Sequence, residues 1–118
     1  LNAVAEDTEE KASQILDALS YILDRNVELA KANKTMVEFI INQIELLESL
    51  TAKFPNVSIF GENLNLAKEL LPTIKDVSIK LTDEDNKIYE AMELMQYHDI
   101  NRQKIERVMA VIKKLSGY

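Results

Sequence analysis

The sequence predicts an all-α protein, in which a long antiparallel helical hairpin pairs with a second copy to form a four-helix bundle. The 118 residues include only 2 glycines and 2 prolines, and the turns of a sheet protein would consume more of both. Apolar residues recur at three- and four-residue spacing over most of the chain, as on one face of a helix. The length is that of one domain, residues 1–118. Cysteine is absent and there is one histidine, which excludes a disulfide framework and a thiolate metal site.

The first helix is predicted at about residues 6–53, where one row of positions repeats every seven residues. That row consists of Ala12, Leu19, Asn26, Asn33, Ile40, Leu47 and Phe54. Further apolar rows lie three and four residues after it, so the apolar stripe is wider than a two-stranded coiled coil needs. Asn26 and Asn33 interrupt the first row, and we interpret them as buried amides that fix the alignment of the helices. A helix of this length requires a long antiparallel companion.

The tip of the hairpin is predicted at about residues 54–61. Pro55 disfavours helical backbone at the residue before it, and Gly61 is a second helix-breaking signal. Three large apolar side chains of this segment are expected to close the end of the core: Phe54, Ile59 and Phe60.

The second arm is predicted at about residues 62–115, with a kink or a break near 72 or at 80–82. Pro72 lacks the N–H that a helix interior uses. Thr82 is a good N-cap, and the three acidic residues after it suit the positive end of a helix dipole. Seven apolar residues of the last stretch are expected to face inward: Ile88, Met92, Met95, Ile105, Met109, Ile112 and Leu115. Gly117 is expected to end the helix.

The width of the apolar stripes predicts a homodimer. Two helices with stripes of this width cannot cover each other, whereas two hairpins that pair into a four-helix bundle can.

Charge and hydropathy restrict the partners and the location of the chain. The formal net charge of -6, with aromatic residues at 6% and no tryptophan, argues against nucleic acid and against an anionic membrane surface. No apolar run approaches the ~20 residues of a membrane span, and the start lacks the pattern of a signal peptide. We therefore expect a cytoplasmic protein. Because the chain begins with Leu1, we also expect it to be part of a longer product.

The polar segment 95–108 is the informative part of the sequence. Where the helical period calls for apolar side chains, it offers His98, Asp99 and Arg102. A polar gap in an apolar stripe is either a buried network or an exposed functional patch.

Asp99 and Gln103 are four residues apart, so on a helix they stand on one face. A carboxamide does not titrate, but it can hold a water by donating to it and accepting from it. A carboxylate can bind a cation, such as a lysine of a partner. This pair could therefore assist a hydrolysis reaction in the active site of another protein, as the water-orienting Gln does in GTPases.

The segment from Gln96 to Val108 resembles the signature of the CheZ family, the phosphatases of the bacterial chemotaxis regulator CheY. The matching residues are the aromatic Tyr97, the pair Asp99 and Gln103, and the later basic residue Arg107; His98 stands where Gln is common. The resemblance implies a dimer of long helical hairpins. It also implies that Gln103 enters the regulator's active site and orients the water that attacks the phospho-aspartate, while Asp99 contacts a lysine of the regulator.

The same resemblance implies the partner and its docking surface. The partner is a phosphorylated CheY-like receiver domain, which supplies its own Mg²⁺, so the chain needs no cofactor. The docking residues are expected to be Tyr97, His98, Arg102, Lys104 and Arg107, with pairing inside the bundle as the alternative for Arg102. The best-known family members carry a C-terminal tail with a regulator-binding helix, and because this chain stops at Tyr118 we expect that tail to be absent or cut away.

Two alternatives use the same segment differently. The run from His98 to Gln103 is also similar to the phosphoacceptor box of one class of sensor histidine kinases, which would make His98 a phosphoacceptor of a phosphotransfer domain. In those kinases the box opens the first helix of a hairpin and an ATP-binding domain follows, whereas here it lies in the last helix. The third hypothesis is a helical scaffold without catalysis, whose function would not change when Gln103 is replaced.

Overall fold

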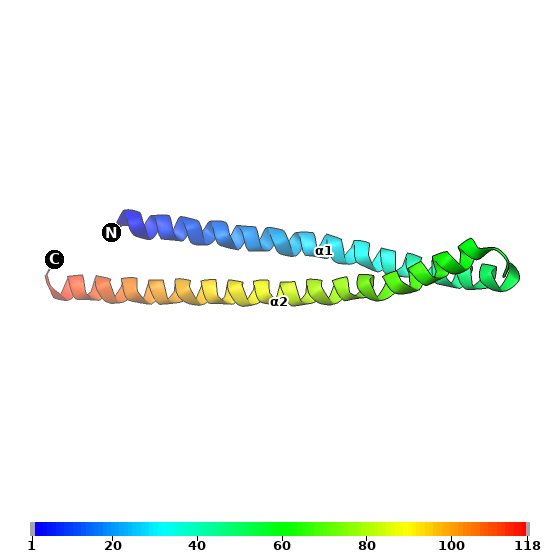
Figure 1. Cartoon of the computed structure of the whole chain (residues 1–118). Helices are drawn as coiled ribbons and strands as arrows, with labels where there is room; N and C mark the ends of the chain where they lie inside the picture. Colours follow the sequence, from blue (N-terminus) through cyan, green and yellow to red (C-terminus); the bar gives the residue numbers. More distant parts are fainter. Residues whose placement is uncertain (1, 118) are drawn as a thin grey trace. The chain divides into compact units, whose positions relative to one another are not determined.

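The computed structural model describes residues 2–117 and contains two helices, α1 (Asn2–Lys53) and α2 (Ser58–Leu115), joined by a short turn (Figure 1). The described residues contain no strand, so the predicted all-α hairpin is confirmed. The helices run through two compact units, one formed by the residues up to Ile22 and from Asn86, the other by Leu23–Asp85. The homodimer stays a prediction. No helix in the described range carries a stretch apolar enough to span a membrane.

The turn lies in the unit Leu23–Asp85 and occupies residues 54–57, which is shorter than the predicted tip of 54–61. α1 ends at Lys53 because Pro55 disfavours helical backbone at Phe54. The amide of Val57 donates to the carbonyl of Phe54 at 3.1 Å and closes the turn. Gly61 does not delay α2, which already begins at Ser58.

The aromatic residues of the turn only partly close the core. The rings of Phe54 and Phe60 lie 6.3 Å apart at a tilt of 53°. Phe60 is half-buried, but Phe54 and Ile59 are exposed. Ile59 therefore does not cap the core as the sequence predicted, because it lies on the solvent side of the first turn of α2.

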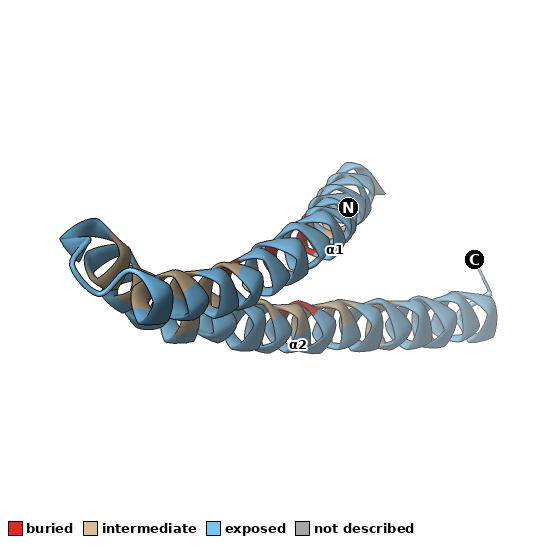
Figure 2. Cartoon of the chain, turned by 90° about the vertical axis from the view of Figure 1, so that its right-hand side faces the viewer, coloured by how far each residue is buried: buried red, intermediate tan, exposed pale blue. Residues whose placement is uncertain are grey.

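The predicted seven-residue row of α1 is the row that α2 covers (Figure 2). In this unit Asn26, Asn33 and Ile40 are buried and Leu47 is half-buried. The Asn33 amide donates to the Ser78 hydroxyl at 2.7 Å. The prediction that the two asparagines are buried is confirmed, and their hydrogen bonds cross to α2.

Asn26 binds acidic side chains of α2. Its amide nitrogen donates to Asp85 Oδ1 at 2.8 Å and to Glu84 Oε1 at 3.3 Å. A hydrogen bond to an ionised acceptor is stronger than one between neutral groups. The two buried asparagines of one row therefore have partners of different chemical kinds.

α2 has no break at either predicted position. Pro72 lies inside the helix with its side chain exposed. Leu71 and Ile74 on either side are half-buried against α1, and this packing holds the helix together where Pro72 removes a backbone donor. Thr82 is not an N-cap, since its hydroxyl donates to the carbonyl of Ser78 at 3.1 Å, four residues back in the same helix.

The other unit pairs the N-terminal part of α1 with the C-terminal part of α2. Ile88 is buried, and five residues farther along the two helices of this unit are half-buried: Ala12, Leu16, Leu19, Met92 and Met95. Four residues that were expected to face inward are instead exposed in the single chain: Ile105, Met109, Ile112 and Leu115. The stripe they form has no cover within the described residues. α2 ends as predicted, with Gly117 at a φ of 78° and its amide bound to the carbonyl of Lys114.

Candidate functional site

The site lies in the unit formed by the N-terminal part of α1 and the C-terminal part of α2, on the stretch of α2 from residue 97 to 107. Six of the predicted residues are exposed here and one is half-buried. The exposed residues are Tyr97, His98, Asp99, Gln103, Lys104 and Arg107, and the half-buried one is Arg102. The four-residue spacing places Asp99 and Gln103 on one side of the helix. The helix thus offers a carboxylate and a carboxamide to solvent on a rigid backbone.

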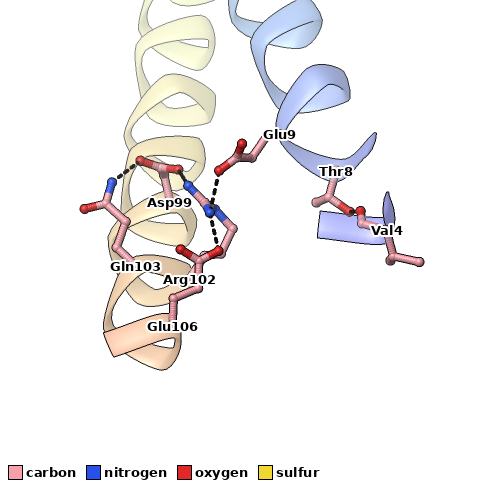
Figure 3. Close-up of polar contacts among 7 residues, drawn as sticks. All are labelled: Val4, Thr8, Glu9, Asp99, Arg102, Gln103 and Glu106. Atoms are coloured by element: carbon pink, nitrogen blue, oxygen red, sulfur yellow. Dashed lines mark hydrogen bonds and ion pairs between the residues drawn. The ribbon is translucent and has the colours of Figure 1, made fainter. Parts of the chain in front are cut away.

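Asp99 and Gln103 are hydrogen-bonded to each other (Figure 3). Gln103 Nε2 donates to Asp99 Oδ2 at 2.9 Å. The amide oxygen of Gln103 points away from the other labelled side chains. Since the nitrogen faces the carboxylate, the orientation of the amide is set, and its oxygen remains available as an acceptor for a water molecule.

Arg102 holds the other oxygen of Asp99. Its Nη2 donates to Asp99 Oδ1 at 2.8 Å, and its Nη1 donates to Glu106 Oε1 at 2.7 Å. The same Nη1 forms an ion pair of 2.5 Å with Glu9 of α1. Arg102 lies seven residues after Met95, on the row of α2 that faces α1, and its side chain is only 22% exposed. One guanidinium therefore joins three carboxylates from the two helices (Figure 3).

This network changes the acid–base behaviour of the pair at its centre. The hydrogen bond from Arg102 lowers the pKa of Asp99 below its ordinary value of 3.8, and the hydrogen bond from Gln103 acts in the same direction. The bond to Asp99 likewise raises the pKa of Arg102. Asp99 is consequently a carboxylate at any physiological pH and cannot serve as a general acid there.

A groove of about 500 Å³ adjoins the network between the two helices of this unit. Its walls come from both helices: Thr8, Glu9, Ala12, Ser13, Leu16, Met95, Gln96, His98, Asp99, Ile100 and Arg102. His98 and Asp99 border this groove, whereas Gln103 is not part of its wall. The amide of Gln103 thus lies outside the groove, although both are formed by the same stretch of α2.

Two residues of the network were not identified from the sequence. Glu106 stands four residues after Arg102, a spacing that alone could have indicated a pair. Glu9 could not have been found in this way, because its contact with Arg102 depends on the register between the helices. No cluster of three or more acidic or histidine side chains suited to a metal ion occurs among residues 2–117.

The comparisons with known proteins that gave a match point to a single protein family. A family model described as protein phosphatase CheZ matches residues 1–118. The chain is 36% identical to the protein phosphatase CheZ of Helicobacter pylori over 118 residues, which are all of this chain and 47% of that protein. The chain therefore spans about half the length of the curated relative it matches. No solved structure matches it significantly.

Proposed function

We propose that this chain, which belongs to the protein phosphatase CheZ family, accelerates the hydrolysis of a phospho-aspartate on a CheY-like receiver domain in bacterial chemotaxis. The observation that carries the proposal is the hydrogen bond between Gln103 and Asp99 on an exposed face of α2. It leaves an oriented amide oxygen that can enter the active site of a partner.

Gln103 is assigned the role of orienting the attacking water. The receiver contributes the phospho-aspartate and the Mg²⁺ that neutralises it, and we assign no cofactor to this chain. Gln103 accepts a hydrogen bond from the water and thereby aligns it with the phosphorus atom. Positioning of this kind contributes several kcal/mol, on the order of the effects of well-oriented groups, without a titrating residue.

Asp99 is assigned two contacts in the complex. It keeps its bond with Gln103, and it accepts a hydrogen bond from a lysine of the receiver. A carboxylate has about four acceptor positions, so these contacts and the one from Arg102 are compatible. The lowered pKa of Asp99 keeps this acceptor charged.

The docking surface around the pair is assigned to Tyr97, His98, Lys104 and Arg107, all of which are exposed. Arg102 was expected in this surface, but its guanidinium is bound by three carboxylates of the chain itself. The remaining basic side chains suit the acidic pocket of a receiver domain.

We also propose that the chain works as a cytoplasmic homodimer. Four apolar residues of one row of α1 are exposed in the single chain: Ile15, Ile22, Leu29 and Met36. An apolar row of this kind on a soluble helix is expected to be covered by a partner. A second hairpin would cover it in a four-helix bundle.

The test is the decay of a phosphorylated CheY-type receiver with and without the chain. The wild type should accelerate decay and release inorganic phosphate, whereas Gln103→Ala should not. Gln14→Ala removes an exposed glutamine of α1 and is the matched control, which should behave as the wild type does. Transfer of the phosphoryl group from the receiver to His98, in an acid-labile form, would instead establish a phosphotransfer domain. Decay unchanged by the wild type would contradict the proposal.

A further inference from the structure

We infer that Arg102 is a positioning residue, which fixes the Asp99 carboxylate so that Asp99 in turn fixes the amide of Gln103. The inference rests on the proposed function, because it assigns the purpose of the network to the orientation of Gln103. Arg102 itself need not touch the receiver.

The geometry divides the Asp99 carboxylate between two donors. Oδ1 accepts from Arg102 at 2.8 Å, and Oδ2 accepts from Gln103 at 2.9 Å. The terminal torsion of an aspartate is broad and rotates easily when nothing holds it. With Oδ1 held, Oδ2 stays in place, and the Gln103 nitrogen has a fixed acceptor. The amide oxygen is then fixed on the opposite side.

Arg102 is itself held from two further directions. Glu106 binds it from the next turn of α2, and Glu9 binds it from α1. Its side chain is 22% exposed, while those of the three carboxylates are about half exposed. The planar fork of a guanidinium can serve several acceptors in fixed directions, which the ammonium of a lysine cannot do. Arg102 thus occupies a position facing α1 where the helical period calls for an apolar side chain.

The charge balance separates this role from docking. Three carboxylates around one guanidinium leave the cluster with an excess negative charge, so it attracts a lysine of the receiver while Arg102 is present. Removal of Arg102 makes the cluster more negative. If Arg102 only positions Gln103, its loss should lower kcat without raising KM. If Arg102 docks the receiver, its loss should raise KM.

The experiment compares Arg102→Met and Arg102→Lys with the wild type, in the full chain and with a phosphorylated CheY-type receiver. We expect kcat to fall about tenfold in Arg102→Met, with KM unchanged or lower, and to recover only partly in Arg102→Lys. Lys87→Met removes one positive charge from an exposed pair with Glu90 on the same helix and is the matched control. Glu9→Gln leaves Arg102 in place but removes its anchor on α1, and a fall of about threefold is expected. If Arg102→Met does not fold, the result for Glu9→Gln decides.

A second readout does not depend on activity. The two side-chain amide protons of Gln103 are assigned by their absence in Gln103→Ala. In Arg102→Met their chemical shifts should move toward the values of a solvent-exposed glutamine side chain. Unchanged amide shifts together with an unchanged kcat would overturn the inference, and so would an increase in KM alone. If wild type does not accelerate decay while the amide shifts still respond to Arg102, the proposed function fails and the positioning of the amide stands.

Discussion

The two buried asparagines of α1 should respond in opposite ways to the same substitution. Asn26 and Asn33 are one heptad apart, and they are 3% and 1% exposed. Asn26 donates to a carboxylate at 2.8 Å, whereas Asn33 donates to a hydroxyl at 2.7 Å. Asn33 Oδ1 is buried and has no hydrogen-bond partner among the described residues. Replacement of each by leucine tests what these contacts contribute.

The magnitude follows from the contacts that each substitution removes. Burial of a leucine on the same row is common to both variants and cancels in the comparison. Asn33→Leu loses a neutral bond of about 1 kcal/mol, but it also removes a buried, unpaired carbonyl that costs about 1–3 kcal/mol. Asn26→Leu loses a charge-assisted bond of about 1.5–3 kcal/mol. Asn33→Leu should therefore be the more stable variant by about 2–4 kcal/mol.

Urea denaturation followed by circular dichroism, at one protein concentration, measures this difference. Asn42→Leu changes an exposed asparagine of the same helix and serves as control, with an expected change within about 0.5 kcal/mol. The reverse order of the two buried variants, or equality within about 0.5 kcal/mol, would refute the reasoning.

Three further predictions concern the site and α2. Asp99→Ala should lower kcat/KM by about 100-fold, which corresponds to the loss of a charge-assisted bond, and receiver dephosphorylation kinetics with unchanged helical content would check it. Because the pKa of Asp99 is lowered below 3.8 in the folded chain, its contribution to stability is present above that value and is lost as the pH falls through the lowered pKa. Acid titration should therefore show the stability advantage of wild type over Asp99→Asn to be constant from pH 8 to 5, and a loss within that range would contradict the assignment. Pro72→Ala should stabilise the chain by about 1–3 kcal/mol, because proline is unfavourable inside a helix, and a lower thermal midpoint would show that Pro72 instead relieves strain.

The periodicity of α1 was sufficient to predict its apolar stripe and the burial of Asn26 and Asn33, but not which row of the stripe α2 covers. The row through Asn26, Asn33 and Ile40 repeats every seven residues over the whole helix, and burial follows it. The second helix was predicted less well. Local signals at Pro72 and Thr82 indicated a kink or a break, but packing of Leu71 and Ile74 against α1 outweighs them, and local propensity does not contain that packing.

The candidate site shows the same division between local and non-local information. The pairing of Asp99 with Gln103 follows from a spacing of four residues on a helix. The partners of Arg102 include Glu9, more than ninety positions away in the sequence, and only the register of the two helices brings them together. From the sequence Arg102 could therefore either dock the receiver or pair within the bundle, and in the structure its guanidinium binds carboxylates of the chain itself.

The central claim is that Gln103 acts on the attacking water rather than on binding. The most direct test is the rate of receiver dephosphorylation at saturating concentrations of wild type and Gln103→Ala, with the affinity of each for the receiver measured in parallel. The account predicts that the rate with Gln103→Ala falls to that of the receiver alone, while the affinity stays within about threefold. A rate at saturation equal to that of the wild type would contradict it, whatever happens to the affinity.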